Sequence, residues 1–453
     1  MTLSVAELQP VLQDLFSDTA DHLANQTHFC RRKRELTGPV FAQSLVFSLL
    51  AKPTSTLEDF ADFAAQHLDI FVTANAFAER FSQTSANFLH TLLLAAFDRS
   101  FDSLRPALLP LLRRFNGVYL RDASLISLPA SLADLFPART GRDGSRSAAV
   151  KMVLEMEVST GQFTEIDFLP ALDNEKTAAV AAKPLPAGSL LLEDMGFLCG
   201  DRLQECIAQE VYVLTRVPCW TAFFLRHRNG KRFQRLDLLQ WLRQAKGDCR
   251  EQQVYVFHKQ KLAVRLLAVR VPEVIAQQRR EQVRADARKR GRPVSQQKLD
   301  LCEWNLLVTN APAELLSAYN AWEVRAVRWQ IELVFKVFKS EGGLEQTQAR
   351  TAWRVLSELF AKLLAMVVQQ WCLLCAGYIM LRQSLRRASK RVRQRAGTLL
   401  RALLVGAQEL GQQLEGLARE VRRCGIEKRH QKISTFDRLA ALDYEFNQLD
   451  PAA

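Results

Sequence analysis

The sequence predicts a mixed α/β fold with an all-helical N-terminal region, a β-rich insertion and a helical C-terminal region. The first observation is that residues 1–113 carry apolar positions at helical spacing. The second is that the period changes near residue 114, where strand-like runs begin with "GVYL" at 117–120. The third is that helical patterns separate the later strand-like runs, which is typical of a mixed sheet covered by helices.

The composition is that of an ordinary globular chain with a strongly positive charge. At 453 residues the chain is long enough for two or three domains. Its 61 Lys and Arg residues against 48 Asp and Glu residues leave a formal net charge of +13. This balance favours polyanionic partners, with nucleic acid as the first expectation and an anionic membrane surface as the second.

The cysteines and the N-terminus predict a cytoplasmic protein. The nine cysteines are scattered without a repeated spacing, which indicates a reducing compartment rather than a disulfide scaffold. The CxxC pair Cys372 and Cys375 lies in an apolar helical run, so buried thiols are favoured over a zinc site. The N-terminal "MTLSVAELQPVLQDLF" has the pattern of an amphipathic helix rather than of a signal peptide.

One apolar run, 363–381, reaches the length of a membrane-spanning helix. Gln369 and Gln370 at its centre favour a buried core helix over a membrane span, so no membrane partner is expected.

The helical N-terminal region permits a DNA-binding helix pair. Ser55 to Glu58 fits a capping box that opens a short helix, and a second helix is expected from about Asn75 to Phe97. Arg80, Gln83 and Asn87 are candidates to face a DNA groove, with the basic cluster "RRKR" at 31–34 nearby. The alternative is a structural helix pair that binds nothing.

The middle of the chain predicts strands and one exposed basic segment. Strands are expected at 117–120, at 148–169 as a hairpin with a Thr-Gly turn, at 188–194, at 211–217 and throughout 218–312. Within the last range, residues 277–298 are too polar for a core. They are interpreted as a solvated loop or as an arm that contacts phosphates.

A helix predicted from 313 to about 340 carries a charged stripe. Its members Arg325, Arg328, Glu332 and Lys339 are offset by three, seven and fourteen positions and would face one direction. Ordinary surface salt bridges are the alternative, since Arg328 and Glu332 form an i, i+4 pair.

Two further acidic residues point to metal-dependent chemistry. Asp122 follows the strand at 117–120, and Asp194 follows the strand-like "GSLLLE" at 188–193. Strand ends meet at one edge of an α/β sheet, so these acids together with Glu332 could hold two Mg²⁺ ions roughly 4 Å apart. The sequence contains no GxxxxGKS phosphate loop and no GxSxG elbow, which excludes the commonest ATPase and serine hydrolase classes.

These residues carry a family resemblance that runs over nearly the whole chain, to its "STFDRL" close. Residues 325–339 resemble the YREK signature, Y-x2-R-x3-E-x6-K, of the insertion-sequence DDE transposases of family four. Arg328, Glu332 and Lys339 match its spacings, whereas Arg325 stands in the place of the tyrosine and Tyr319 is out of register. "RDASLISLP" around Asp122 and "LLEDMGF" around Asp194 resemble the segments that hold the family's two aspartates.

The resemblance implies an RNase H-like mixed sheet catalytic core interrupted by a β-rich insertion. It implies that Asp122, Asp194 and Glu332 are the catalytic and metal-binding triad, for two Mg²⁺ ions that Mn²⁺ could replace. It implies that Arg328 and Lys339 contact DNA phosphates, as Arg325 also could. Trp304 would stack on a flipped base, the alternative being a core tryptophan on a strand.

The expected organisation follows from the same resemblance. The expected domains are 1–113, helical and DNA-binding; 114–217, the first part of the core; 218–312, the insertion; 313–383, the second part of the core; and 384–453, a basic helical region. Double-stranded DNA is the expected partner, as element terminal inverted repeats and as target DNA, bound by a synaptic homodimer in the bacterial cytoplasm at the nucleoid.

Three functions remain as hypotheses. The first is a DNA transposase that cuts at its inverted repeats and transfers the freed strand to target DNA. The second is a metal-dependent nuclease without strand transfer. The third is a catalytically impaired, transposase-derived DNA-binding protein.

Overall fold

The computed structural model describes residues 3–31, 35–104, 109, 111–140, 144–218, 221–227, 229, 232–380, 382–425, 435 and 437–441. The chain divides into two compact units. Unit 1 comprises Met1–Leu108, Asp122–Asp173 and Gln330–Ser434, and unit 2 comprises Leu109–Arg121, Asn174–Trp329 and Thr435–Ala453. Each unit therefore gathers segments that are far apart in the sequence, and the unit boundaries differ from the predicted domain boundaries.

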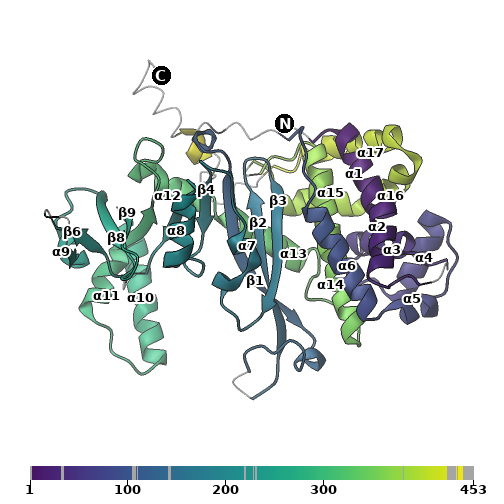
Figure 1. Cartoon of the computed structure of the whole chain (residues 1–453), viewed down its shortest axis with the longest axis horizontal. Helices are drawn as coiled ribbons and strands as arrows, with labels where there is room; N and C mark the ends of the chain where they lie inside the picture. The colour runs from purple at the N-terminus through teal and green to yellow at the C-terminus, as the bar shows by residue number, and fades with distance from the viewer. Residues whose placement is uncertain are drawn as a thin grey trace. The chain divides into compact units, whose positions relative to one another are not determined.

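Helices make up most of unit 1 (Figure 1). They are α1 (Val5–Asp14) with a π-helical continuation (Leu15–Thr19), α2 (Ala20–Gln26), α3 (Gly38–Ala51), α4 (Leu57–Leu68), α5 (Ala74–Arg80), α6 (Gln83–Phe97), α13 (Trp329–Ser340), α14 (Ala352–Cys375), α15 (Leu385–Gln394), α16 (Ala396–Val405) and α17 (Ala407–Val421). Buried phenylalanines fill the N-terminal part, where the Phe41 and Phe77 rings lie 6.1 Å apart. α14 packs against α3 and α6, and a buried hydrogen bond of 2.9 Å joins the hydroxyls of Ser85 and Ser357.

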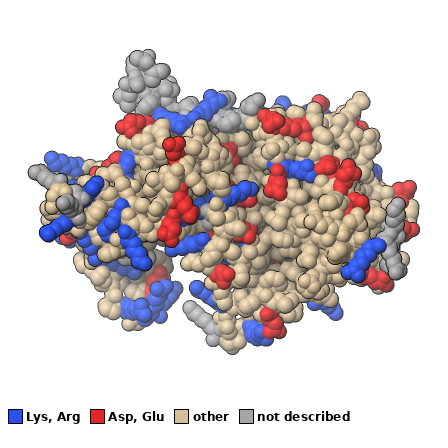
Figure 2. Space-filling view, viewed as in Figure 1, with Lys and Arg blue, Asp and Glu red and all other residues tan. Residues whose placement is uncertain are grey.

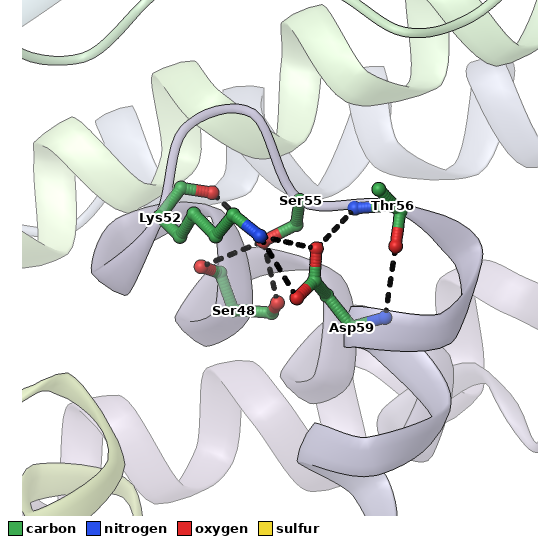
Figure 3. A network of polar contacts seen from close by, with 5 residues as sticks. All are labelled: Ser48, Lys52, Ser55, Thr56 and Asp59. Atoms are coloured by element: carbon green, nitrogen blue, oxygen red, sulfur yellow. Dashed lines mark hydrogen bonds and ion pairs between the residues drawn. The ribbon is translucent and has the colours of Figure 1, made fainter.

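The capping box that opens α4 lies one residue later than predicted. Thr56 and Asp59 form it: the Asp59 N–H donates to the Thr56 hydroxyl at 3.2 Å, and the Thr56 N–H donates to the Asp59 carboxylate at 2.7 Å (Figure 3). Ser55 instead closes the turn after α3, because its hydroxyl donates to the Lys52 carbonyl at 2.8 Å. Lys52 also forms an ion pair with Asp59 at 2.8 Å. The prediction of a capping box was therefore correct, but the prediction that Ser55 and Glu58 form it was wrong.

The single helix predicted from Asn75 to Phe97 is two helices, α5 and α6. Ser82 breaks it by capping α6, because the Ser85 N–H donates to the Ser82 hydroxyl and the Ser82 N–H donates to the Ser85 hydroxyl at 2.9 Å. The break separates Arg80 on α5 from Gln83 and Asn87 on α6, which were predicted together to face a DNA groove. The Arg80 guanidinium turns into unit 1, 4.0 Å from the centre of the Phe29 ring and 3.1 Å from the Leu36 carbonyl.

Gln83 and Asn87 are both exposed on α6. Of the predicted basic cluster at 31–34, only Arg31 belongs to the described residues.

The strands of unit 1 form the predicted hairpin. β2 (Ala148–Glu157) and β3 (Gln162–Pro170) are antiparallel, and their order continues to β1 (Val118–Leu128) as β3-β2-β1. Gly161 in the turn has φ +79°, a left-handed conformation that glycine adopts without strain. β1 is longer than predicted, because it continues to Leu128. Its first four residues belong to unit 2, and the remainder belongs to unit 1.

Unit 2 is built on a mixed sheet with the order β1-β4-β5-β10-β9-β8-β6-β7. Its other strands are β4 (Leu190–Glu193), β5 (Tyr212–Arg216), β6 (Phe224–Arg226), β7 (Phe233–Arg235), β8 (Cys249–Val256), β9 (Leu262–Arg270) and β10 (Trp304–Thr309), and its helices are α7 (Ala179–Ala182), α8 (Gly200–Ala208), α9 (Leu238–Arg243), α10 (Glu273–Lys289), α11 (Gln296–Asp300) and α12 (Ala318–Ala326). β1, β4 and β5 run parallel, and the pairs from β5 onward are antiparallel. Alternating strands and helices precede a β-rich stretch, as predicted.

The basic segment predicted at 277–298 is largely helical rather than a loop. α10 runs through Lys289, and two of its arginines are held by unit 2: Arg279 donates to the Asn305 side chain at 2.9 Å, and Arg280 pairs with Glu303 at 2.6 Å. The later cations Arg284, Arg288, Lys289, Arg290 and Arg292 are exposed. Figure 2 shows Lys and Arg side chains gathered over this part of unit 2.

The apolar run predicted at 363–381 belongs to a core helix. α14 has the length and composition to cross a membrane, yet 89% of its most apolar window is buried inside the protein. The helix ends at Cys375, so residues 376–380 are not part of it. Gln370 is buried and donates to the Gly161 carbonyl at 2.6 Å, which satisfies an amide that lipid would leave unpaired.

The CxxC pair, Cys372 and Cys375, has the character of structural thiols. The eight cysteines that lie among the described residues are all free. Burial raises the pKa of Cys372 to about 12 and also raises the pKa of Cys375. Both therefore stay protonated near neutral pH, in agreement with the prediction of core thiols.

Lys362 on α14 predicts a pH dependence of stability. Its side chain is buried, and its ammonium group donates to the Gly343 carbonyl at 3.0 Å and to the Gln346 carbonyl. Burial lowers the pKa of Lys362 from 10.5 to about 8, against the opposing charge of Glu358. Between these pH values the unfolded chain binds more protons than the folded chain, so the free energy of unfolding is expected to rise with pH.

Urea denaturation of the native chain and of Lys362→Met at pH 8 and pH 10 measures this effect. The rise should be smaller in Lys362→Met, which has no ammonium group to titrate. An equal rise in both proteins would assign the pH dependence to other groups.

Candidate active site

A buried ion pair aligns β1 with β4 in unit 2. Arg121 and Glu193 are partners in the parallel register of the two strands, and the Arg121 guanidinium lies 3.7 Å from the Glu193 carboxylate. Arg202 on α8 adds a second contact, 3.1 Å from the same carboxylate oxygen. The side chains of Arg121 and Glu193 are 0% and 1% exposed, so this network holds the two strands together in the absence of water.

The two predicted aspartates follow this pair directly. Asp122 follows Arg121 inside β1, not after the end of a strand as predicted, because β1 continues to Leu128. Its carboxylate accepts a hydrogen bond of 2.9 Å from the Ala123 N–H. Asp194 does follow the end of β4, as predicted. Each aspartate is therefore one residue beyond the same register pair.

The helix predicted from 313 to 340 is two helices, so the predicted continuous stripe is wrong. α12 ends at Ala326, and α13 begins at Trp329 after a turn at Val327 and Arg328. Glu332 lies in the first turn of α13, where the positive end of the helix dipole stabilises a carboxylate. Glu332 and Lys339 remain seven residues apart on one face of α13, whereas Arg325 lies on another helix.

Arg325 lies against Asp194 within unit 2. Its guanidinium is 3.6 Å from the Asp194 carboxylate, and the Arg325 and Asp194 side chains are 9% and 46% exposed. Arg325 is thus a counter-charge for a predicted catalytic acid, and its side chain is buried.

Lys339 ties α13 to β1 within unit 1. Its ammonium group donates to the Leu125 carbonyl and pairs with Glu345 at 3.2 Å. Glu345 in turn accepts a hydrogen bond of 3.1 Å from the Ser127 N–H. The helix that carries Glu332 and the strand that carries Asp122 are therefore joined through Lys339.

Trp304 lies in the core of unit 2. It is 7% exposed in β10, and the Arg270 guanidinium lies 4.7 Å from the centre of its ring. This position is that of a core tryptophan on a strand, which is the alternative to a residue that stacks on a flipped base. An aromatic residue that sequence reasoning missed is Trp329, which is 57% exposed at the start of α13, one turn before Glu332. Its position beside Arg328 within the signature-like stretch was the available signal.

The three acids suit a divalent metal by their chemistry. Carboxylate oxygens are the ligands that Mg²⁺ and Mn²⁺ favour, and Asp122 and Glu332 are half-buried, as the ligands of a partly enclosed ion would be. Asp122 and Glu332 belong to unit 1, and Asp194 belongs to unit 2. Among the residues that the structure describes, no group of three or more His, Cys, Asp or Glu side chains is assembled for a metal ion.

Comparison with known proteins shows what the chain is similar to. Residues 114–368 match the family model described as a transposase DDE domain. The transposase for insertion sequence element IS231F of Bacillus thuringiensis subsp. israelensis is 24% identical over 384 residues, which covers 81% of this chain and 80% of that protein. The transposase for IS231E of B. thuringiensis subsp. finitimus is 23% identical and covers 99% of this chain and 98% of its own length.

A solved structure is also similar over most of the chain. It is the piggyBac transposase in a synaptic complex with hairpin DNA, studied by cryo-EM, with a TM-score of 0.47 and 7% identity over 94% of this chain and 87% of that one.

The matched domain spans more than half of the chain, which therefore belongs to the DDE transposase family. The protein is a DNA transposase, an enzyme that acts on DNA, and its family uses divalent metal ions.

Proposed function

We propose that this transposase is encoded by an insertion sequence of family four, binds the terminal inverted repeats of that element, cuts at their ends and joins the freed 3′ end to target DNA. The observation that carries the proposal is the buried Arg121–Glu193 pair, because Asp122 and Asp194 each follow one of its members. The strand orders β3-β2-β1 in unit 1 and β1-β4-β5 in unit 2 support an RNase H-like core.

The three acids divide the work of one active centre. Asp122 on β1, Asp194 after β4 and Glu332 on α13 would each contribute a carboxylate. Two divalent cations held by these carboxylates, Mg²⁺ or Mn²⁺, would supply activation of the attacking water or hydroxyl and stabilisation of the leaving oxygen. Arg328, directly before α13, would attract the DNA backbone.

The partners follow from the chemistry. Double-stranded DNA serves as element end and as target, and a homodimer would bring two element ends together. The net charge of +13 supports an association with DNA in the bacterial cytoplasm.

Incubation of the protein with a labelled duplex that carries the element end, Mg²⁺ and a target plasmid tests this function. Nicking at the element end together with joined plasmid products is the expected result. Nicking without joined products would favour the nuclease, and binding without nicking would favour a transposase-derived DNA-binding protein.

The ion pair between Arg325 and Asp194 predicts an effect on metal binding. Arg325→Tyr, which restores the signature residue, removes a cation that lies 3.6 Å from Asp194. Because Asp194 is partly exposed, the pair is worth about 1 kcal/mol, so Mn²⁺ affinity is expected to increase roughly fivefold. Electron paramagnetic resonance of bound Mn²⁺ measures this without DNA.

Arg325→Lys is the matched control because it keeps the positive charge. It should bind Mn²⁺ as the native chain does. Equal affinities in all three proteins would mean that Arg325 does not compete with the metal for Asp194.

A further inference from the structure

A cleft of about 920 Å³ in unit 1 runs along the side of α13, next to the face that carries Glu332. Its walls come from α13, α15, the end of α3 and the segment between α14 and α15. Apolar side chains, including Leu333, Val337 and Met380, line its floor. Lys336, one helical turn after Glu332, also lines it.

The walls of this cleft are strongly cationic. The lining includes five cations, Lys336, Arg386, Arg387, Lys390 and Arg393, and one acidic residue, Glu341. This leaves a formal charge of +4 when the single acid is subtracted from the five cations.

Glu341 is already neutralised by two of these cations. Arg386 lies 2.7 Å and Arg393 2.8 Å from its carboxylate. Burial alone would raise the pKa of Glu341, but hydrogen bonds and charge from Arg386 and Arg393 outweigh burial and lower it. Glu341 is therefore ionised and paired with Arg386 and Arg393. Lys336 and Lys390 are the cations of the lining that we expect to bind an external anion.

The sequence of α15 holds its cations toward the cleft. Ala388, Ser389 and Val392 form its buried face, and Gln369 on α14 donates to the Ser389 hydroxyl at 2.9 Å. Residues 385–394 contain five Lys and Arg residues and no Asp or Glu. Such a density of like charge lowers the stability of the free protein and is offset when a polyanion binds.

We propose that the cleft between α13 and α15 binds the phosphodiester backbone of DNA, independently of base sequence, beside the strand that Glu332 helps to cut. The inference rests on the proposed function, since the DNA must lie along α13. Lys336 and Lys390 contact phosphates, and the apolar floor accommodates the sugars. The lining favours charge recognition because it carries five cations and one acid, and a cation that contacts a phosphate does not distinguish between bases.

The double variant Lys336→Gln/Lys390→Gln tests this site. Both lysines are exposed, so the fold should persist, which thermal denaturation checks. DNA binding is measured between 50 and 200 mM salt with an element-end duplex, an unrelated duplex and an unrelated single strand. Loss of two phosphate contacts should lower the slope of log affinity against log salt by about 1.8 with duplex DNA. The ratio of affinities for the element end and the unrelated duplex should stay unchanged.

The control is Arg419→Gln/Arg423→Gln, at the end of α17 and in the turn after it, which removes two exposed charges of the same unit outside the cleft. Its salt slope should match that of the native chain. Equal slopes in both double variants would overturn the cleft proposal, and a reduced slope for element-end DNA alone would overturn its independence of sequence.

Two further arms separate other outcomes. Vesicles with phosphatidylserine replace DNA in one arm. If the Lys336→Gln/Lys390→Gln variant lost vesicle binding but bound DNA as the native chain does, the cleft would be assigned to a membrane surface. Nicking of the element end by the native chain is measured in the other. If the native chain nicks the element end but the variant keeps the native salt slope, the cleft proposal is rejected and the proposed function stands. If the native chain neither nicks nor binds DNA, the proposed function itself is rejected.

Discussion

Glu332→Gln is expected to lower the rate of element-end cleavage by roughly a hundredfold or more while DNA affinity stays within a few-fold of the native value. The amide keeps the size of the side chain but removes the negative charge that a hard divalent cation requires. Loss of a group that only supports a ligand already costs 10- to 100-fold, so loss of a ligand should cost at least as much. Gel electrophoresis of nicked product and a binding titration, both with Mg²⁺, measure the two quantities.

Glu415→Gln provides the matched control for this variant. Glu415 is an exposed helical glutamate of the same unit on α17, so the same chemical change there should leave cleavage unaltered. Native cleavage by Glu332→Gln would remove Glu332 from the proposed triad.

Local patterns in the sequence predicted much of the fold. The hairpin β2-β3 was predictable because alternating apolar residues flank a Thr-Gly turn, and Gly161 has the positive φ that such a turn requires. Asp194 was predicted after a strand because the apolar run at 190–192 ends just before Glu193 and Asp194. These features depend on neighbours in the chain, which a sequence displays.

Elements that depend on distant partners were not predictable in this way. β1 continues past the polar residues Asp122 and Ser124, where the local pattern favours the end of a strand. The turn between α12 and α13 contains neither proline nor glycine, and buried Val324, Val327 and Ile331 continue the apolar pattern across it. Periodicity reports which face is buried, and it does not report whether the backbone hydrogen bonds continue.

In the candidate site, too, the acids could be predicted from the sequence, whereas contacts between distant segments could not. The resemblance identified the three acids, which remain the proposed triad. The contact of Arg325 with Asp194 and the use of Lys339 as a link to β1 join segments far apart in the sequence. The resemblance led to the expectation that both side chains contact phosphates, which stays a prediction. Their partners within the protein could not be read from the sequence, because a carboxylate, a carbonyl and a phosphate can all accept hydrogen bonds from a cation.

Glu193→Gln is expected to lower the free energy of unfolding by about 3–5 kcal/mol, because it removes the buried carboxylate charge that faces Arg121 and Arg202. The amide preserves the volume of the side chain, so the loss reflects charge and not a cavity. Since Asp122 and Asp194 follow the Arg121–Glu193 register pair, cleavage should also fall in the fraction that remains folded. Chemical denaturation gives the stability change, and Mn²⁺ affinity of the folded protein reports the alignment of the acids independently of turnover.

Asp300→Asn separates this effect from the general loss of an ion pair. Arg243 and Asp300 pair at 3.2 Å in the same unit, with the arginine side chain 72% exposed. Removal of such a pair should cost no more than about 1 kcal/mol, because water solvates the remaining arginine. If Glu193→Gln were no more destabilising than Asp300→Asn and bound Mn²⁺ normally, the buried pair would not align the strands. The expected difference between the two variants follows from the burial of Glu193 and from its contacts with two arginines, since the Arg243 partner of Asp300 is largely exposed.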